Sequence, residues 1–408
     1  MTVAGDGGSG VELILVLNCG SSSIKFTLFD TSLEHEVADG SIERIGEAEP
    51  VLKFRWGDDA LTQPIAAADH TAALMEFHRV LRDPRWGHGA TVVGVGHRVV
   101  HGGESFVEST LITPEVEQTI EEYFSLAPLH NPPNLAGIRA ARQFFPRVSH
   151  VAVFDTAFHQ SMPEQAYLYA IPYELYQEER IRKYGFHGTS HRFVSGRAAE
   201  LLGKANGFTG ITCHLGNGCS LTAVKDGRSV DTSMGLTPLE GVPMGTRSGD
   251  IDPAIIFHLA ERRGMALREI NQLLQRRSGL LGVGGVSNDL RENIRAADEG
   301  NHRAELAMEV YAYRVRKYIG AYLAVLGGAD AVVFTGGVGE NGVDMRRRVL
   351  QGLDRLGLIF DAARNEACRG REGEISAPGS PIKALVIPTN EELLIARDTR
   401  ELMRRPSS

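Results

Sequence analysis

Two stretches of this chain share one order of apolar and small residues, and that order limits the folds available to it. Residues 13–29 and 211–224 each consist of an apolar strand, a bend of Gly, Ser or Asn, and a second apolar strand, which favours a β-hairpin. Further along the chain, each hairpin is followed by a buried strand that ends in a polar loop, at 151–155 and at 331–335. The repeat predicts a duplicated α/β domain with a cleft between the halves. Because α/β proteins without duplication also reuse such units, the residues alone leave both alternatives open.

Helical signals lie between and after these strands. Asp252 and Pro253 predict a helix that continues to residue 263, residues 302–326 have apolar residues at helical spacing, and residues 390–402 form a third candidate with Asn390 as its cap. Strands and helices alternate over the whole length. We therefore expect an α/β fold with antiparallel hairpins inside each sheet.

Length and charge exclude several classes of protein. A chain of 408 residues predicts two domains at roughly 100–200 residues per domain. The net charge is −8, and no basic run is long enough to predict a nucleic-acid surface. No apolar run reaches the roughly 18–20 residues of a membrane span, so we expect no membrane partner.

Cysteines and the N-terminal residues indicate the compartment. The four cysteines contain no CxxC pair, which argues against a zinc site and favours reduced thiols. Residues 1–10 have neither a basic residue nor an apolar stretch, so they predict a flexible tail rather than a secretory signal. We expect a cytoplasmic protein.

Three glycine-rich loops are candidates for phosphate binding. They lie at 20–23 with Lys25 close behind, at 216–218 and at 336–341. Backbone N–H groups that converge in such loops bind phosphates, and glycine lets the backbone approach closely. None of the three is a GxxxxGK[ST] loop or a dinucleotide fingerprint, which argues against an oxidoreductase. A single loop of this kind is commonly an ordinary turn, but three of them after buried strands favour a nucleotide site.

Cations set among small residues suggest an anionic substrate. Arg98 and His101 precede Gly102, Arg247 lies between Gly245 and Gly249, and His187 and His191 flank a glycine turn. Arg side chains bind carboxylates and phosphates through two parallel hydrogen bonds. A structural ion pair or a buried histidine is the alternative for each residue taken singly. Their number favours an anion site.

Oxygen-bearing side chains follow or precede apolar segments at three positions. Asn18, Asp155 and Glu391 are candidates for a magnesium site, because Mg²⁺ prefers oxygen ligands and binds through few protein groups. Helix caps and surface charges are the alternative interpretation of Asp155 and Glu391.

Eight motifs of the chain resemble, in order, those of the acetate kinase family. They run from about residue 13 to residue 399, and eight in order are far more specific than one. They are LVLNCGSSSIKF at 15–26, APLHNP at 127–132, FDTAFH at 154–159, YGFHGTSH at 184–191, HLGNG at 214–218, GLTP at 235–238 with MGTRSGD at 244–250, FTGGVGEN at 334–341, and TNEEL at 389–393.

The resemblance implies two duplicated ribonuclease-H-like domains around a nucleotide cleft, as in sugar kinases, actin and heat-shock ATPases. The N-terminal domain would comprise residues 11–157 and 391–408, with the C-terminal helix packing back onto it, and the nucleotide-binding domain would comprise 158–390. A homodimer is also implied. Cys219 and Pro243 depart from the family pattern, and Pro243 puts the mobility of the loop around Arg247 in doubt.

The implied activity is reversible, Mg²⁺-dependent transfer of the γ-phosphoryl group of ATP to acetate, giving acetyl phosphate and ADP by in-line displacement. Mn²⁺ is the alternative metal, and propionate or butyrate the alternative acceptor. An actin-like or chaperone-like ATPase is a further alternative. The pair Arg98 and Arg247 argues against it, because water needs no carboxylate-binding arginine.

The resemblance also implies residue roles. Asp155, His187, Arg247 and Arg98 would be catalytic, with Asp155 in the position usually assigned to proton transfer. Val100, Leu129, Phe186 and Pro238 would line the pocket for the acetate methyl group next to Arg98. Asn18 and Glu391 would bind the metal. ATP would contact Lys25, His214, Leu215, Gly216, Asn217, Gly218, Asp289, Leu290, Arg291, Gly337, Val338, Gly339, Glu340 and Asn341.

Overall fold

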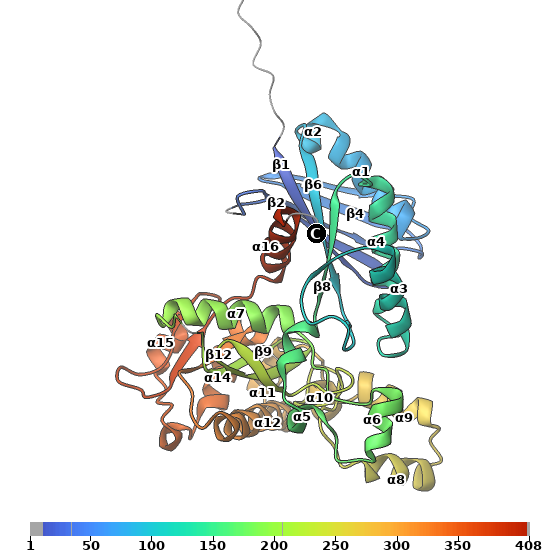
Figure 1. Ribbon diagram of the computed structural model, residues 1–408. Helices are drawn as coiled ribbons and strands as arrows, with labels where there is room; N and C mark the ends of the chain where they lie inside the picture. The colour runs from blue at the N-terminus through green and yellow to red at the C-terminus, as the bar shows by residue number, and fades with distance from the viewer. Residues whose placement is uncertain (1–10, 34, 206, 406–408) are drawn as a thin grey trace, which may run out of the picture. The chain divides into compact units, whose positions relative to one another are not determined.

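The computed structural model describes residues 11–405 except 34 and 206, so the expected tail at 1–10 lies outside the described residues. The chain divides into two compact units, with breaks between Ala157 and Phe158 and between Thr389 and Asn390 (Figure 1). The segment after Thr389 therefore belongs to the same unit as the N-terminal half. Of the described helices, none is both long and apolar enough to cross a membrane.

The first unit is built on an eight-stranded mixed sheet. β1 is antiparallel to β2 and parallel to β6, which in turn is parallel to β8. The strands in sheet order are β5 (Asp59–Pro64), β4 (Val51–Trp56), β3 (Glu36–Glu43), β2 (Ser23–Asp30), β1 (Glu12–Cys19), β6 (Thr91–Val99), β8 (Ser149–Phe154) and β7 (Thr110–Leu111). The helices are α1 (His70–Arg82), α2 (Pro84–Gly87), α3 (Pro114–Glu122), α4 (Asn131–Phe144) and α16 (Glu391–Arg404), with a 3-10 turn at Tyr123–Ser125.

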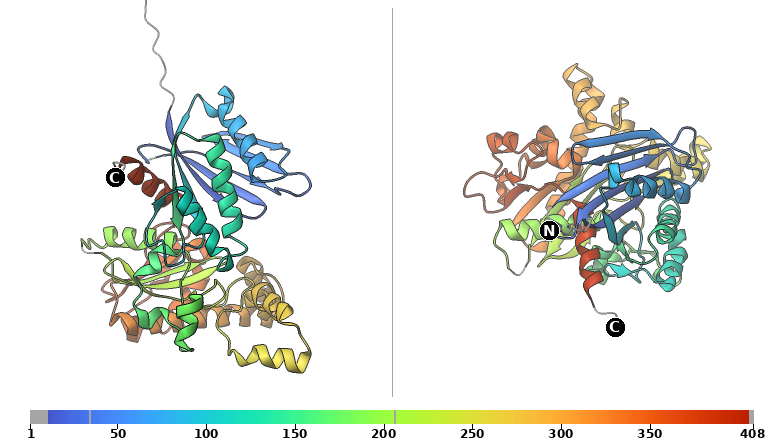
Figure 2. Two further views of the ribbon diagram at one scale, coloured as in Figure 1. Left: turned by 45° about the vertical axis from the view of Figure 1, so that its right-hand side comes forward. Right: turned by 90° about the horizontal axis from the view of Figure 1, so that it is seen from above.

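Helices cover both faces of β1, which explains its unbroken apolar sequence. Successive strand residues point to opposite faces. Leu13 and Leu15 therefore pack into the core that includes residues of α1 and α4, whereas Ile14 packs with Ile395 of α16. Figure 2 shows α16 on the face of this sheet opposite α1 and α4. A strand buried on both faces is typical of the parallel centre of an α/β sheet.

The second unit is built on a six-stranded sheet. β9 is antiparallel to β10 and parallel to β12, and β12 is parallel to β14. Helix α7 packs on one face of the sheet and α12 on the other (Figure 1). The strands in sheet order are β11 (Arg228–Thr232), β10 (Cys219–Lys225), β9 (Gly210–Leu215), β12 (Ala331–Thr335), β14 (Lys383–Val386) and β13 (Gly373–Glu374).

The helices of the second unit differ greatly in length. They are α5 (Glu164–Tyr167), α6 (Tyr173–Glu179), α7 (Gly188–Leu201), α8 (Ala254–Arg263), α9 (Leu267–Arg276), α10 (Gly279–Gly284), α11 (Leu290–Asp298), α12 (His302–Leu326), α13 (Gly336–Asn341), α14 (Val343–Leu350) and α15 (Ala362–Ala367), with 3-10 turns at Ala157–Ser161 and Asp354–Leu356. The expected helices at 254–263 and 302–326 are confirmed as α8 and α12, which end at Gly264 and Gly327 in left-handed backbone.

Both units share one topology, a hairpin followed by two parallel strands. The two hairpins expected from the sequence are confirmed as β1–β2 and β9–β10. The expected match between 151–155 and 331–335 is wrong. Strand β12 pairs directly with the hairpin strand β9 and so corresponds to β6, whereas β8 corresponds to β14. Gly94 and Gly96 interrupt the apolar pattern of β6 and hide this correspondence in the sequence.

Those two glycines allow α16 to approach β6 closely. A Cβ atom on Gly96 would lie 2.5 Å from Thr399 Oγ1 and 2.6 Å from Ile395 Cγ2. A Cβ atom on Gly94 would lie 2.2 Å from Met403 Sδ. Real Cβ atoms do not pack so tightly, so any larger residue would push the helix away from the sheet. The position of α16, and of Glu391 at its first turn, therefore depends on glycine in β6.

We predict that Gly96→Val lowers the melting temperature, because the added methyl groups overlap α16 and overpacking costs about 1–3 kcal/mol. Thermal unfolding followed by circular dichroism measures the change. Gly196→Ala on α7 is the control, since a Cβ there meets nothing within 4 Å and alanine favours a helix. Equal melting temperatures for wild type and Gly96→Val would contradict the packing described.

Candidate active site

Four polar residues of the first unit meet at one edge of its sheet. Asn18 lies near the end of β1, Arg98 near the end of β6, and Asp155 directly after β8. Since these strands are parallel, their carboxyl ends lie at the same edge. Glu391 begins α16, which packs on all three strands. The fold thus brings together residues that the sequence separates by more than 300 positions.

Arg98 holds this group together. Its Nε donates to Asp155 Oδ1 at 3.0 Å and its Nη2 donates to Asp155 Oδ2 at 2.6 Å, which makes a two-point ion pair. Its Nη1 donates to Asn18 Oδ1 at 3.3 Å. Such planar pairs fix the guanidinium orientation more firmly than a single contact would. The Asp155 side chain is almost fully buried, at 2% exposure, while 23% of Arg98 remains exposed.

The charge of the group depends on Glu391. Burial raises the pKa of Glu391 to about 7; Arg98 opposes that shift, and Asp155 and Glu392 add to it. Burial disfavours the charge on Arg98, yet attraction by Asp155 and Glu391 raises the pKa of Arg98 above its ordinary value. When Glu391 is ionised, two carboxylates next to one guanidinium leave a net negative site. An additional cation would relieve that charge.

The donor set of this group fits a divalent cation that binds through few protein groups. Among the described residues, no three Asp, Glu, His or Cys side chains are placed to form a metal cage. Asn18 supplies an amide oxygen and Glu391 a carboxylate whose charge lacks a full partner. Mg²⁺ prefers oxygen ligands and keeps several waters, so it needs no cage of this kind.

The other expected residues of the first unit differ in their exposure to solvent. Lys25 lies directly opposite Asn18 in the β1–β2 ladder, so both side chains project from the same face of the sheet. Lys25 is exposed and lines a hollow of about 500 Å³. Val100 is buried, and its N–H donates to Asn134 Oδ1 at 3.0 Å. Leu129 is 68% exposed.

In the second unit, histidines cluster around one serine. His187 precedes α7 in left-handed backbone, with φ 56°, and its Nδ1 lies 2.9 Å from Ser220 Oγ. His191 Nε2 lies 2.7 Å from the same oxygen. A hydroxyl donates only once, so at least one imidazole must donate to Ser220. The ring of His187 stacks on His214 at 4.3 Å, and His214 Nδ1 lies 2.8 Å from Ser190 Oγ.

Arg247 and His187 approach each other at the glycine loop after β9. A Cβ on Gly218 would lie 3.4 Å from His187 Nε2 and 3.7 Å from Arg247 Nη1. Arg247 Nη1 donates to the Pro238 carbonyl at 3.4 Å, and burial lowers the pKa of Arg247. Within the described residues, no carboxylate pairs with Arg247. A half-buried guanidinium that no described carboxylate pairs with, next to an imidazole and a glycine loop, is suited to bind an anion.

The expected nucleotide residues other than Lys25 fall into three places of the second unit. Asn217 is linked to its surroundings by Asn288 Nδ2, which donates to its Oδ1 at 3.1 Å, and by the Gly245 N–H, which donates to its carbonyl at 3.2 Å. Asp289 caps α11 and pairs with Arg291 at 2.6 Å, and 88% of the Arg291 side chain is exposed. Leu290 is buried.

Residues 336–341 form the short helix α13 rather than a loop. The Glu340 carboxylate accepts from the N–H groups of Gly336 at 2.9 Å and Thr389 at 3.1 Å. Its side chain therefore holds the start of its own helix. Gly337 has nothing within 4 Å of an added Cβ, so its surface is open.

The comparisons with known proteins agree along the whole chain. The sequence profile of the acetokinase family matches residues 13–397. The chain belongs to the acetokinase family. An acetate kinase of Desulfitobacterium hafniense (strain DSM 10664 / DCB-2) is 52% identical over 399 residues, which cover 96% of this chain and 99% of the relative. An acetate kinase of Methanosarcina thermophila is 51% identical over 395 residues, covering 96% and 97%.

Solved structures agree with the acetokinase assignment. Porphyromonas gingivalis acetate kinase superposes with a TM-score of 0.92 at 46% identity, covering 96% of this chain and 100% of that one. A propionate kinase from Francisella tularensis superposes with a TM-score of 0.89 at 42% identity, covering 96% and 99%. The expected α/β fold with two duplicated domains and the expected kinase family are confirmed.

Sequence reasoning missed the residues that hold the acetokinase motifs in place. Ser220 follows the HLGNG motif by two positions and contacts both His187 and His191. Asn134 donates to the Cys19 carbonyl at 2.7 Å and accepts from Val100, so it links the ends of β1 and β6. Ser220 could have been found from its place in the strand after the motif. Asn134 carries no local signal, because its partners are distant in sequence.

Proposed function

We propose that this protein is an acetate kinase that transfers the γ-phosphoryl group of ATP reversibly to acetate, giving acetyl phosphate and ADP. Family membership over residues 13–397 carries the proposal. The two residue groups described above support it: a guanidinium–carboxylate group in the first unit and an imidazole–guanidinium group in the second.

Each group has a separate task in this proposal. Arg98 binds the acetate carboxylate, and Val100, Leu129, Phe186 and Pro238 contact the methyl group. His187 and Arg247 stabilise the transferring phosphoryl group. Lys25, the 214–218 loop, Asp289–Arg291 and 337–341 contact ATP.

Charge stabilisation is the main chemical requirement of the reaction. Acetate and the γ-phosphoryl group are both anionic, and the loose transition state spreads charge over the equatorial oxygens. Arg98, His187 and Arg247 supply fixed N–H donors for these oxygens, without reorganisation during the reaction. We propose Mg²⁺ as the metal, held by Asn18 and Glu391, with Mn²⁺ as the alternative. When bound, it would supply a positive charge next to the ATP phosphates.

Asp155 has a positioning role in this proposal rather than a proton-transfer role. Acetate has a pKa near that of a Glu side chain, about 4.3, so it is ionised at pH 7 and needs no general base. Both carboxylate oxygens of Asp155 accept hydrogen bonds from Arg98. This geometry supports a role in orienting Arg98, and its negative charge favours a nearby cation.

Propionate is the second candidate acceptor. The similarity to the Francisella tularensis propionate kinase supports it. One extra methylene in an apolar pocket changes the free energy of transition-state binding by only about 1–3 kcal/mol. We therefore expect propionate to react more slowly than acetate without being excluded.

We also propose that the protein is a cytoplasmic homodimer. The surface of the second unit supports dimerisation, since no residue of α8 is buried and Phe257 on it is 64% exposed. Exposed apolar groups of this kind commonly mark protein interfaces.

The activity test measures ADP release from Mg-ATP with acetate, propionate, butyrate or no acceptor, and traps acyl phosphate with hydroxylamine. We expect acetate-dependent ADP, trapped acetyl phosphate and slower propionate turnover. Arg98→Ala should lower kcat/KM about 10²–10³-fold. Arg139→Ala, whose side chain is half exposed on α4, is the control. ADP release that ignores every acceptor would indicate an ATPase instead.

Asp155→Asn separates the two roles of that residue. We expect kcat/KM to fall about 10²–10³-fold, activity to recover partly as the Mg²⁺ concentration rises, and the pH profile to keep its shape. Glu401→Gln, from an exposed pair with Arg405, should change none of these. A pH profile that loses an ionisation, with no rescue by Mg²⁺, would restore the proton-transfer role.

The dimer is tested by sedimentation at micromolar concentration. We expect a mass of twice the 44.4 kDa of the chain, and a shift toward the monomer in Phe257→Glu, because a charge disfavours burial of that position. Leu356→Glu, at a 50% exposed leucine, is the matched control. Wild type that sediments as a monomer would contradict the proposal.

A further inference from the structure

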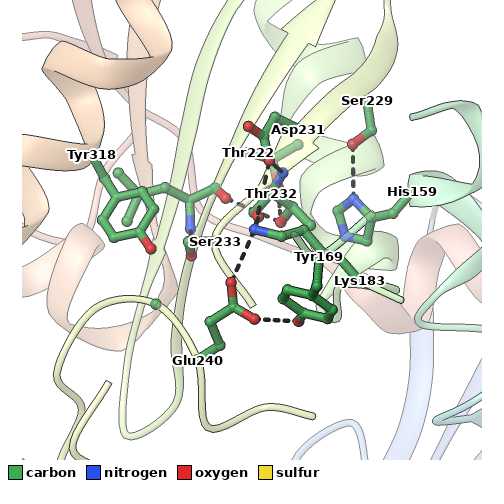
Figure 3. A network of polar contacts seen from close by, with 12 residues as sticks. His159, Tyr169, Lys183, Thr222, Ser229, Asp231, Thr232, Ser233, Glu240 and Tyr318 are labelled. Carbon is green, nitrogen blue, oxygen red and sulfur yellow. Dashed lines mark hydrogen bonds and ion pairs between the residues drawn. The ribbon is translucent and has the colours of Figure 1, made fainter. Parts of the chain in front are cut away.

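A network of polar contacts surrounds Lys183 and Glu240 in the second unit (Figure 3). Lys183 lies four residues before His187, and Glu240 lies seven residues before Arg247. The Lys183 ammonium and the Glu240 carboxylate are 3.2 Å apart. This contact joins two segments that are far apart in the sequence.

The Lys183 ammonium makes one hydrogen bond and two ion-pair contacts. Nζ donates to the Thr232 carbonyl at 2.9 Å and forms ion pairs with Glu240 and, at 3.8 Å, with Asp231. Only 13% of the Lys183 side chain is exposed. The backbone that follows is also fixed, because the N–H groups of Tyr184 and Gly185 donate to the Gly235 carbonyl at 3.1 and 3.2 Å. The segment leading to His187 is thus held by its side chain and its backbone.

Glu240 extends the network to Tyr169. The Tyr169 hydroxyl donates to Glu240 Oε2 and accepts from the Leu236 N–H at 2.9 Å. Gly235 leaves the space for this contact, since a Cβ there would lie 1.7 Å from Glu240 Oε2 and 2.1 Å from the Tyr169 oxygen. Glu240 is therefore anchored on both sides, by an ammonium and by a phenol.

The loop after Glu240 is closed at its base. The Gly241 N–H donates to Asp250 Oδ1 at 2.8 Å, and the Asp250 N–H donates to the Gly241 carbonyl at 2.8 Å. The Tyr318 hydroxyl on α12 donates to Asp250 Oδ2 at 2.6 Å. Arg247 lies inside this closed loop. These contacts fix the ends of the loop. Arg247 itself is held by hydrogen bonds, since its carbonyl accepts from the Met244 N–H at 3.0 Å and its Nη1 donates to the Pro238 carbonyl at 3.4 Å.

The charges explain why Lys183 matters to both segments. Burial raises the pKa of Asp231, Lys183 lowers it, and Glu240 adds to the rise. Burial and the charge of Glu240 raise the pKa of Tyr169 above its ordinary value. Without the ammonium, two partly buried carboxylates would repel each other with no cation between them, and a buried charge left unpaired drives rearrangement.

We propose that Lys183 and Glu240 form a positioning pair that holds His187 and Arg247 at the separation required by the transferring phosphoryl group. The inference rests on the proposed kinase function and assigns neither residue a contact with substrate. Misplacement of a catalytic group by about 1 Å can lower a rate 10²-fold. Loss of the pair should therefore reduce the rate of the chemical step while leaving acetate binding at Arg98 intact.

The test compares Lys183→Met, Glu240→Gln and the double variant in the acyl phosphate assay. We expect each single variant to lower kcat about 10–100-fold with KM for acetate changed less than about threefold. The kcat of the double variant should be no lower than the kcat of the slower single variant, because both changes break the same contact. Lys183→Arg should recover part of the rate. Tyr169→Phe removes one hydroxyl and should lower kcat about 3–10-fold. This variant tests the inference even if Lys183→Met does not fold.

Lys204→Met is the matched control, because Lys204 also pairs with a carboxylate of the second unit, Asp330, at 2.7 Å. It should retain the wild-type kcat. If Lys183→Met and Tyr169→Phe both fold and both keep the wild-type kcat, the inference is overturned. The proposed acetate kinase function would not be affected by that result. Independent, multiplicative losses in the double variant would also overturn it. Wild type that forms no acyl phosphate would overturn the proposed function, and the inference with it.

Discussion

The buried charge of Asp155 is the constraint on which the first unit depends. A carboxylate at 2% exposure is unfavourable unless its oxygens are paired, and Arg98 binds both of them. The same guanidinium contacts Asn18, so three strands of the sheet end at one polar group. Because Glu391 adds a second carboxylate, the group retains negative charge that a bound cation can neutralise. The ion pair thus fixes the orientation of Arg98, to which we assign the substrate carboxylate in the proposed function.

In the second unit, the charged group of the candidate site is a cation, Arg247. Arg247 is half-buried, and no carboxylate of the described residues pairs with it, so burial lowers its pKa without an opposing ion pair. A guanidinium in this state cannot be oriented by an ion pair. Its loop is instead closed by Asp250 and Gly241 and joined to the segment of His187 by Lys183 and Glu240. Carboxylates thus orient the loop at its ends and leave the guanidinium itself free of them. This arrangement agrees with the anion-binding role proposed for Arg247.

The duplicated topology explains why both groups lie at sheet edges. In each unit, a hairpin strand pairs in parallel with the next long strand, so the turns after parallel strands converge. In the first unit, these ends carry Asn18, Arg98 and Asp155. In the second, His214 lies near the end of β9, the glycine loop follows that strand, and α13 follows β12. Helix α16 follows β14 along the chain but belongs to the first unit, where it packs on the sheet. Its first residue, Glu391, therefore lies near Arg98.

The sequence by itself determined the two hairpins, the helices α8 and α12, and the family, because these depend on local periodicity, turn residues and ordered short motifs. It also singled out Arg98, Asp155, His187 and Arg247 as polar residues among small ones. Only the tertiary structure decided that β12 corresponds to β6 rather than to β8, since two glycines that admit α16 break the apolar pattern of β6. Only the tertiary structure revealed Asn134, Ser220, Lys183 and Glu240 as supporting residues. Their contacts join positions far apart in the chain, and no local pattern records which distant partner a side chain will meet.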